Sequence, residues 1–396
     1  MLSMHILFSI IGSFLVVITA PLVVELLLVT IASLLPRGDT QSVIGHGTHR
    51  LAVVIPAHNE ETSISRCVES LRVSADHSVK VYVVAHNCTD LTAQLAKSAG
   101  AEVLVYDDPE AIGKGHVLRF GFQHSIQCGA DAVLVVDADS VVSVNLLPAV
   151  QSAFSQGVEA VQCRYEMKGA KGQVKTELIS LALRGFNFIR PLGRQRIGLS
   201  AGILGNGFAL SANVLKDVPY DALSVVEDLE YHLHLVLAGK RVHFLDEAVV
   251  SSELPTSTKG ETVQHSRWEG GRLRVAHTWL PKLLKELLRG KLTVLEPLLD
   301  LAGLPIAFGM MALLSAACLP LSWVRLYVVL AMTVLLAHVL RAISAGPRRL
   351  HALRVLLLVP FYLLWKLRLI PSVLRASSAK AAWIRTDRKA EDRIAA

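Results

Sequence analysis

Charged residues are scarce in this chain. Asp, Glu, Lys and Arg make up 18% of its 396 residues, whereas 52% are hydrophobic. Soluble domains carry about 25% charged residues, so the composition excludes an ordinary soluble enzyme. The hydrophobic excess is concentrated at the two ends of the chain, which predicts membrane segments there.

Cysteine is also sparse, and no two of the 5 cysteines have the CxxC spacing. This pattern excludes a zinc ribbon and a disulfide framework, and it is typical of reduced thiols in a cytosolic compartment. The cysteines are Cys67, Cys88, Cys128, Cys163 and Cys318.

Basic runs interleaved with aromatic residues are missing as well, although the formal net charge is +7. Nucleic acid is therefore not an expected partner. Phosphate-bearing substrates and anionic membrane lipids fit the positive charge better.

Residues 1–36 form the first expected membrane segment, a transmembrane anchor that is almost wholly apolar. A cleaved signal peptide is the alternative, but the apolar run is too long and lacks a basic region before it. Glu25 is costly in hydrocarbon and should face protein or an interface. Because Arg37, His46 and Arg50 follow the segment, we expect the next region on the cytoplasmic side of the plasma (inner) membrane.

Residues 50–270 alternate short apolar runs with helical patterns. Such alternation predicts an α/β domain with a mainly parallel sheet. The expected strands are 51–55, 81–85, 103–106 and 132–136, with later ones at 160–164, 208–211 and 242–245, and the expected helices are 60–72, 90–99, 114–128 and 143–155.

The remainder of the chain again has membrane character. Residues 271–292 mix Lys and Arg with Leu, Trp and Val, as an amphipathic helix on a membrane surface does. Residues 293–345 contain two long apolar runs, 298–319 and 323–343, which predict a transmembrane hairpin. In 346–396, a short apolar run precedes many basic residues, so we expect an interfacial or re-entrant helix and a basic cytosolic tail rather than a fourth span.

Two carboxylates, Asp137 and Asp139, directly follow the apolar run 132–136. Open α/β sheets bind their ligands at the carboxyl ends of such buried strands. Both carboxylates can serve one site only if the strand ends in a turn, and a hard divalent cation bridging to a phosphate would explain their crowding. A plain surface turn is the alternative, because Asp is common in turns.

Three further stretches carry suitable polar groups. Residues 53–61 give a strand, a Pro-marked turn and a helix start, where backbone amides could hold a nucleotide. Lys114 lies between two glycines and offers a cation to a diphosphate, although a simple helix start would also explain it. Glu227 and Asp228 open a helix, where a favourable helix-dipole interaction competes with the role of a general base.

The last polar stretch is 264–268. If it is helical, Gln264, Arg267 and Trp268 share one face and offer an amide, a guanidinium and an aromatic ring. The Arg-Trp pair is also consistent with an interfacial membrane anchor.

In order and spacing, these stretches resemble the family 2 glycosyltransferases, especially the membrane-bound branch with cellulose, hyaluronan and poly-N-acetylglucosamine synthases and ceramide glucosyltransferase. The resemblance covers residues 51–268 and rests on residues 55–60, 137–139, 227–228 and 264–268. It implies a GT-A fold that binds a nucleotide-sugar, usually a UDP-sugar, together with Mg²⁺ or Mn²⁺.

The resemblance also implies a role for each residue. Asp139 would bind the metal and Asp137 the nucleotide side of the donor, while Asp228 would deprotonate the acceptor hydroxyl for inverting attack. The other residues would bind the substrates: Pro56, Ala57, Asn59, Glu60 and Lys114 the donor, and Glu227, Gln264, Arg267 and Trp268 the acceptor and the donor diphosphate.

His86 departs from the family pattern, because many relatives carry an acidic residue there that contacts the base. A histidine at this position does not specify which nucleobase the donor carries. The other interpretation is that His86 is a neutral, locally bonded turn residue. Four arginines near residue 190 could meet lipid headgroups or an anionic acceptor, with a solvated basic face as the alternative. They are Arg184, Arg190, Arg194 and Arg196.

The leading expectation is an integral-membrane, metal-dependent hexosyltransferase that extends a polysaccharide. About three spanning segments are few for a self-contained polysaccharide channel, which keeps open single-sugar transfer to a lipid or lipid-linked acceptor, a homo-oligomer or a partner membrane subunit. A sugar nucleotidyltransferase is the alternative of another class, because its sheet can also end in paired carboxylates. A non-catalytic membrane scaffold is the third.

Overall fold

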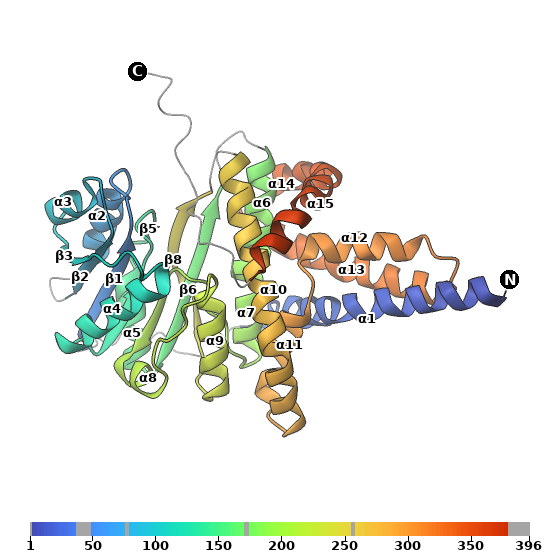
Figure 1. Cartoon of the computed structure of the whole chain (residues 1–396), viewed down its shortest axis with the longest axis horizontal. Helices are drawn as coiled ribbons and strands as arrows, with labels where there is room; N and C mark the ends of the chain where they lie inside the picture. The colour runs from blue at the N-terminus through green and yellow to red at the C-terminus, as the bar shows by residue number, and fades with distance from the viewer. Residues whose placement is uncertain (1, 37–48, 76–78, 170–173, 255–257, 379–396) are drawn as a thin grey trace, which may run out of the picture.

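The structure is a computed structural model that describes residues 2–36, 49–75, 79–169, 174–254 and 258–378. The α/β domain lies at one end of an elongated molecule, and apolar helices project from the other (Figure 1). The expectations placed on Arg37, His46 and the basic tail 379–396 lie outside the described residues.

Within the described residues, the strands form one 8-stranded sheet in the order β3-β2-β1-β4-β7-β6-β8-β5. β1 to β4 are mutually parallel, as are β6 and β8, whereas β7 runs antiparallel to β4 and β6, and β5 to β8. The α/β fold with a mainly parallel sheet is thus confirmed. The strands are β1 (Leu51–Ala57), β2 (Lys80–His86), β3 (Glu102–Tyr106), β4 (Ala132–Val135), β5 (Val141–Val142), β6 (Ala160–Lys168), β7 (Phe208–Ser211) and β8 (His243–Glu253).

Helices cover both faces of the sheet, which explains the continuous apolar character of its central strands. Val53 and Ile55 of β1 pack in the core on one face, and Val54 packs in the core on the other. The first face is covered by α2 (Ile64–Ser74), α3 (Thr92–Ser98) and α5 (Leu146–Ser155), and the second by α4 (Lys114–Gln127), α8 (Ala212–Asp217) and α9 (Glu227–Leu237).

A helical segment that we did not predict lies between the sheet and the apolar helices. It consists of α6 (Val174–Arg184), the π-helical turn η1 (Gly185–Ile189) and α7 (Arg190–Arg196). Phe188 and Ile189 bury their side chains in one cluster with Ile343 of α13 (Ser322–Ser344). This segment joins the α/β domain to the apolar part of the chain.

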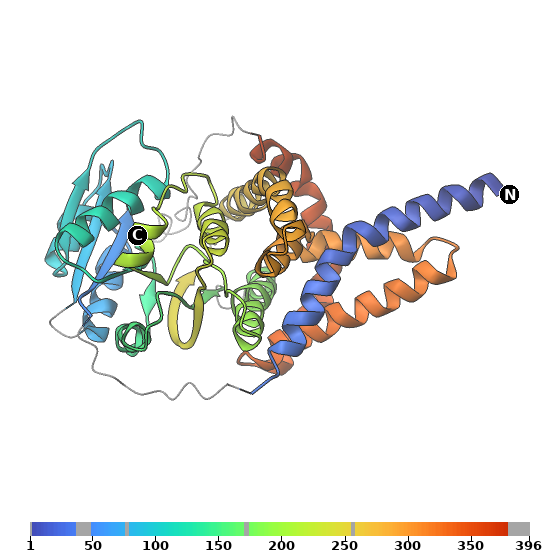
Figure 2. The same ribbon diagram turned by 90° about the horizontal axis from the view of Figure 1, so that it is seen from below.

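The C-terminal third is helical. α10 (Thr258–Leu288) is a single helix that carries both the 264–268 stretch and most of the predicted amphipathic segment. α14 (Arg349–Val355), η3 (Leu356–Leu358) and α15 (Val359–Ala376) follow the apolar helices, and α15 packs back along α10 (Figure 2).

Among the described residues, two helices are long and apolar enough to cross a membrane: Ser3–Ala32, within α1 (Leu2–Ala32), and α13. The predicted apolar run 298–319 is not one straight helix. It forms two helices, α11 (Leu295–Ala302), which follows η2 (Leu292–Val294), and α12 (Ile306–Ala317). The chain bends by 72° between them. The bend lies at Pro305, which lacks a backbone donor and disfavours continuation of a helix. Helices α11 and α12 form a third candidate span only if the two are counted as one bent segment.

A buried network of ion pairs joins the apolar helices to the α/β domain. In α1, Glu25 accepts hydrogen bonds of 2.9 Å from Arg190 Nε and from Arg194 Nη2 of α7. Asp300 of α11 pairs with the same two arginines at 2.7 and 3.0 Å. Arg272 of α10 lies 2.7 Å from Asp300 and adds a fourth helix to the network.

Two sequence expectations are settled by this network. Glu25 faces protein, as we expected, because it is only 1% exposed. The solvated basic face is wrong for Arg190 and Arg194, which are each 5% exposed and paired with carboxylates.

We expect Glu25→Ala to destabilise the protein by about 3–5 kcal/mol, because removing one partner of a buried ion pair leaves the other charge uncompensated. Thermal unfolding in detergent measures the effect. Glu286→Ala is the matched control: Glu286 near the end of α10 pairs with Arg289 just after the helix, and this pair is partly exposed, so a loss below about 1 kcal/mol is expected. Equal unfolding temperatures for the two variants would contradict this interpretation of the network.

Candidate active site

β4 ends in a tight turn that carries both carboxylates of the 137–139 stretch. The Ser140 amide donates to the Asp137 carbonyl at 3.0 Å, which closes the turn. Asn206 holds this turn in place. Its side chain accepts a hydrogen bond from the Asp137 amide at 3.1 Å and donates one to Ser140 Oγ at 2.9 Å. Asp137 and Asp139 therefore line the same cavity, as one shared site requires.

Lys114, the first residue of α4, lies beside this turn. Its ammonium group forms an ion pair with Asp137 and donates to the Gly205 carbonyl at 2.6 Å. Burial lowers the pKa of Lys114, but the charges of Asp137 and Glu227 more than offset this, so the net pKa is raised. The lysine is a fixed cation at the edge of the cavity, which suits a diphosphate.

Glu227 and Asp228 are the first two residues of α9 and line the same cavity. Burial raises the pKa of both, and the neighbouring Asp228 charge helps to bring that of Glu227 to about 7. A Cβ at Gly205, where φ is +75°, would lie 3.0 Å from Asp228 Oδ2. Glycine there lets the backbone approach the carboxylate closely. A carboxylate with a raised pKa is suited to accept a proton.

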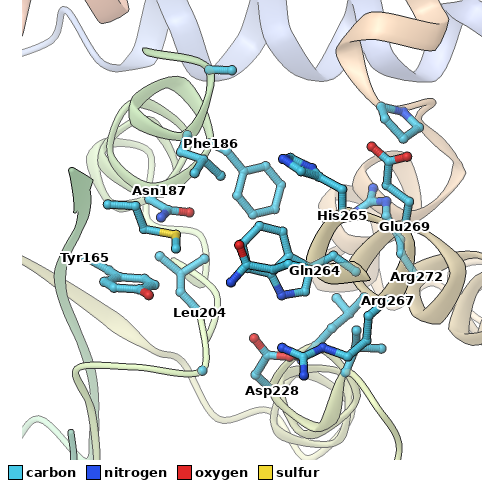
Figure 3. A pocket seen from close by; sticks show the side chains of 18 of the residues that line it. Tyr165, Phe186, Asn187, Leu204, Asp228, Gln264, His265, Arg267, Glu269 and Arg272 are labelled. Atoms are coloured by element: carbon cyan, nitrogen blue, oxygen red, sulfur yellow. The ribbon is translucent and has the colours of Figure 1, made fainter. Parts of the chain in front are cut away.

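The stretch 264–268 is helical, as the one-face interpretation requires, and Gln264, Arg267 and Trp268 all line the cavity. Figure 3 shows Gln264 and Arg267 on the same side of the cavity as Asp228. Burial lowers the pKa of Arg267, and the nearby acidic groups oppose this. Because a guanidinium stays protonated in proteins, Arg267 is a half-buried cation facing the carboxylates.

Pro56, Ala57 and Glu60 line the cavity where β1 ends, but Asn59 is missing from the described residues that line it. The Asn59 side chain instead accepts a 2.8 Å hydrogen bond from the Thr89 amide and so fixes the loop after β2. This hydrogen bond gives Asn59 a positioning role, and the donor contact that the resemblance implied for it stays a prediction.

His86 lies at the cavity and not on an exposed turn. It is buried, its ring stacks on Tyr106 with 5.2 Å between ring centroids, and Asn87 Nδ2 lies 3.1 Å from its Nε2. Burial lowers its pKa, so the ring is neutral at pH 7. A neutral, locally bonded histidine is the second of the two sequence interpretations.

Several cavity residues could not be found from the sequence. Tyr165 of β6 and Asn187 of η1 face the cavity from the side opposite α10 (Figure 3). Lys366 of α15 lines it from the C-terminal end of the chain. These residues belong to no recognisable motif, and only tertiary packing brings their segments together.

The cavity is large, about 980 Å³, and it is not confined to the α/β domain. From the carboxylates it continues between the apolar helices. The lining there comes from α1, α12, α13 and α15, including Leu22, Ile306, Met310, Val339 and Leu363.

The ligand atoms available at the carboxyl end of β4 fit a divalent cation. Asp137 and Asp139 supply carboxylate oxygens, the ligands that Mg²⁺ and Mn²⁺ prefer. A second cluster of carboxylates is also closely spaced and consists of Glu25, Glu296 and Asp300. Its charges are already compensated by Arg190 and Arg194, so it is part of the ion-pair network.

A mainly parallel α/β sheet with paired carboxylates at a strand end, an acidic helix start and a helical Gln-Arg-Trp face define a glycosyltransferase of the GT-A type. Residues 49–271, more than half of the chain, match the family model described as "Glycosyltransferase like family 2". The chain belongs to this family.

Comparisons with individual proteins agree with this. Probable glycosyltransferase YdaM of Bacillus subtilis is 24% identical over 249 residues, which cover 60% of this chain and 58% of YdaM, less than two thirds of its length. Protein RfbJ of Shigella flexneri is 34% identical over 98 residues, covering 25% of this chain and 70% of RfbJ. The structure of the mannosyltransferase PcManGT from Pyrobaculum calidifontis, solved with GDP-Man and Mn²⁺, has a TM-score of 0.55 at 17% identity and covers 94% of this chain and 100% of that one. This last likeness supports the fold.

The raised pKa of Glu227 predicts a pH-dependent stability. Between pH 4.5 and about 7 the unfolded chain loses a proton that the folded protein keeps, so stability falls as the pH rises. The loss is up to about 3 kcal/mol at about 1.4 kcal/mol per pH unit. Glu227→Gln carries no such proton, and its stability relative to the wild type should rise across this window. Thermal unfolding midpoints between pH 4 and 8 test this, and parallel curves for the two proteins would contradict it.

Proposed function

We propose that this protein is an integral-membrane, inverting glycosyltransferase that moves one sugar from a nucleotide-sugar to a hydroxyl group of a lipid or lipid-linked acceptor. The observation that carries the proposal is the continuity of the cavity. Asp137, Asp139 and Asp228 line one end, and apolar side chains of α1, α12 and α15 line the other. A lipid tail at the apolar end would leave its head group near Asp228.

Polysaccharide extension, the leading expectation from the sequence, has less support. A hydrophilic polymer needs a polar path out of the active site, whereas the continuation of this cavity is lined by apolar residues such as Leu22, Met310 and Leu363, together with charged residues that are already paired with one another. The apolar lining favours the lipid acceptor that was the second expectation.

The donor would bind along the carboxyl ends of β1 and β4. Pro56, Ala57 and Glu60 line the nucleotide end, and Lys114 and Arg267 supply cations for the diphosphate. Mg²⁺ or Mn²⁺ held by Asp139, with Asp137 beside it, would neutralise charge on the departing nucleoside diphosphate. His86 at the same end leaves the base open, so both UDP-sugars and GDP-sugars belong in a donor panel.

Asp228 would act as the general base. It takes the proton of the acceptor hydroxyl while that oxygen attacks the anomeric carbon from the face opposite the diphosphate, which inverts the configuration. Gln264 and Trp268 would line the acceptor position beside it. Burial and the charge of Asp137 raise the pKa of Asp228, which favours proton uptake.

Replacing the base should separate binding from catalysis. We expect Asp228→Asn to lower the transfer rate by about 10²–10⁴-fold, the usual contribution of a general base, while binding of labelled donor changes little. Asp221→Asn is the matched control, because Asp221 is 65% exposed at its side chain and lies before α9. Wild-type turnover in Asp228→Asn would contradict its assigned role.

The acceptor class is tested by sizing the product. Purified protein in lipid nanodiscs is incubated with Mn²⁺ or Mg²⁺ and labelled UDP-glucose, UDP-galactose, UDP-N-acetylglucosamine or GDP-mannose. One lipid-mobile product carrying a single sugar is expected. A ladder of lengthening products would support polymer synthesis instead, and pyrophosphate release from a sugar phosphate and a nucleoside triphosphate would support a nucleotidyltransferase.

A further inference from the structure

The half of the cavity next to the apolar helices is densely charged. We call it the acceptor half and define it by its polar lining. His232, one helical turn after Asp228, lies near Arg194 and Asp300, so the acceptor half begins beside the proposed base. Its polar lining residues are Glu25, Arg190, Arg194, His265, Glu269, Arg272, Asp300, His338 and Lys366.

Each arginine of the acceptor half is matched by a carboxylate. Arg190 and Arg194 pair with Glu25 and Asp300, and Arg272 pairs with Asp300. A third carboxylate lies behind them, because Glu296 Oε1 is 2.5 Å from Arg194 Nε. Three guanidinium groups thus face three carboxylates, so each of these cations already has an acidic partner.

The lysine of the acceptor half is matched in the same way. Lys366 of α15 forms an ion pair with Glu269 of α10, and its side chain is 3% exposed. Its ammonium group lies 3.2 Å from His265 Nδ1. Burial and the Lys366 charge lower the pKa of His265 well below its usual range, so the imidazole adds no charge.

Apart from Arg194 Nε, which lies 2.5 Å from Glu296 Oε1, two buried polar atoms in the acceptor half have no hydrogen-bond partner among the described residues: Glu269 Oε2 and His338 Nε2. His338 is 2% exposed, and its other ring nitrogen lies 2.8 Å from Thr30 Oγ1. A carboxylate oxygen can only accept a hydrogen bond, and the imidazole nitrogen accepts or donates according to its tautomer. A hydroxyl group can donate to the Glu269 oxygen, and it can donate to or accept from the His338 nitrogen, whereas a fully ionised phosphate cannot donate to Glu269 and is repelled by it.

We propose that the acceptor half binds an uncharged, hydroxyl-bearing lipid head group and discriminates against a phosphate-linked one. This inference rests on the proposed transfer to a lipid and specifies its acceptor. An anionic head group would have to displace Glu269 from Lys366 or a carboxylate from the arginines, which leaves a buried charge without its partner. The donor half differs, because the acidic excess at Asp137 and Asp139 suits a divalent cation, which would hold the diphosphate together with Lys114 and Arg267.

The test compares acceptors in nanodiscs made of phosphatidylcholine. Full-length protein receives the labelled nucleotide-sugar that gave the highest turnover in the donor panel, with dioleoylglycerol, C18 ceramide, undecaprenyl phosphate or dioleoylphosphatidic acid at equal amounts. We expect labelling of a neutral lipid to exceed labelling of either phosphate lipid by at least about tenfold, a difference of about 1.4 kcal/mol in transition-state binding. Equal or preferred labelling of a phosphate lipid would overturn the inference but leave lipid glycosylation standing.

Other outcomes of the same experiment would contradict the proposed function itself. A labelled polymer, or no labelled lipid with any acceptor while free nucleoside diphosphate accumulates, would contradict transfer to lipid and the inference with it.

A charge variant gives a second readout. Glu269→Gln removes the carboxylate that matches Lys366, so the ratio of phosphate-lipid to neutral-lipid labelling should rise by about tenfold or more. Glu286→Gln, on the partly exposed end of the same helix, is the matched control and should leave the ratio unchanged. An unchanged ratio in Glu269→Gln, with neutral-lipid transfer retained, would contradict charge matching as the source of selectivity.

Discussion

The ion pairs between Glu25 and the arginines of α7 are the constraint on which the rest of the structure depends. Glu25 lies in a helix that is otherwise apolar, and Arg190 and Arg194 lie in the segment that leaves the sheet. None of these charges can be buried alone without a large desolvation cost. Their pairing therefore fixes α1 against α7, and Asp300 extends the same constraint to α11. These ion pairs join the two parts of the chain that together line the cavity.

The two halves of the cavity differ in their charge balance. Near the carboxyl end of β4, the acidic groups outnumber the basic ones, and burial raises the pKa of Glu227 and Asp228. That excess suits a divalent cation and a proton acceptor. In the acceptor half, Arg190, Arg194 and Lys366 are matched by carboxylates. A charged donor and an uncharged acceptor would therefore each meet the environment that suits it.

Local pattern was enough to predict the central sheet and the carboxylate turn, because β4 is a buried apolar run that ends in Asp137 and Asp139. The rest depended on tertiary contacts. Nothing in the local sequence shows that Asn59 has a positive φ of 55° and binds the loop after β2. Arg190 looked like part of a basic surface because its partner Glu25 lies 165 residues away in the chain. The strand 208–211 was predicted, but its antiparallel direction as β7 was not, and the short β5 carries no signal apart from its pairing with β8.

The central claim is that an acceptor lipid enters the cavity with its tail between the apolar helices. Photo-crosslinking with a diazirine on the acyl chain of the acceptor, followed by peptide mass spectrometry, tests it most directly. We expect crosslinks at Leu22, Met310 or Leu363, which line the cavity. These crosslinks should be lost when unlabelled acceptor competes. Crosslinks confined to exposed positions such as Phe14 and Leu330, with no competition, would contradict it.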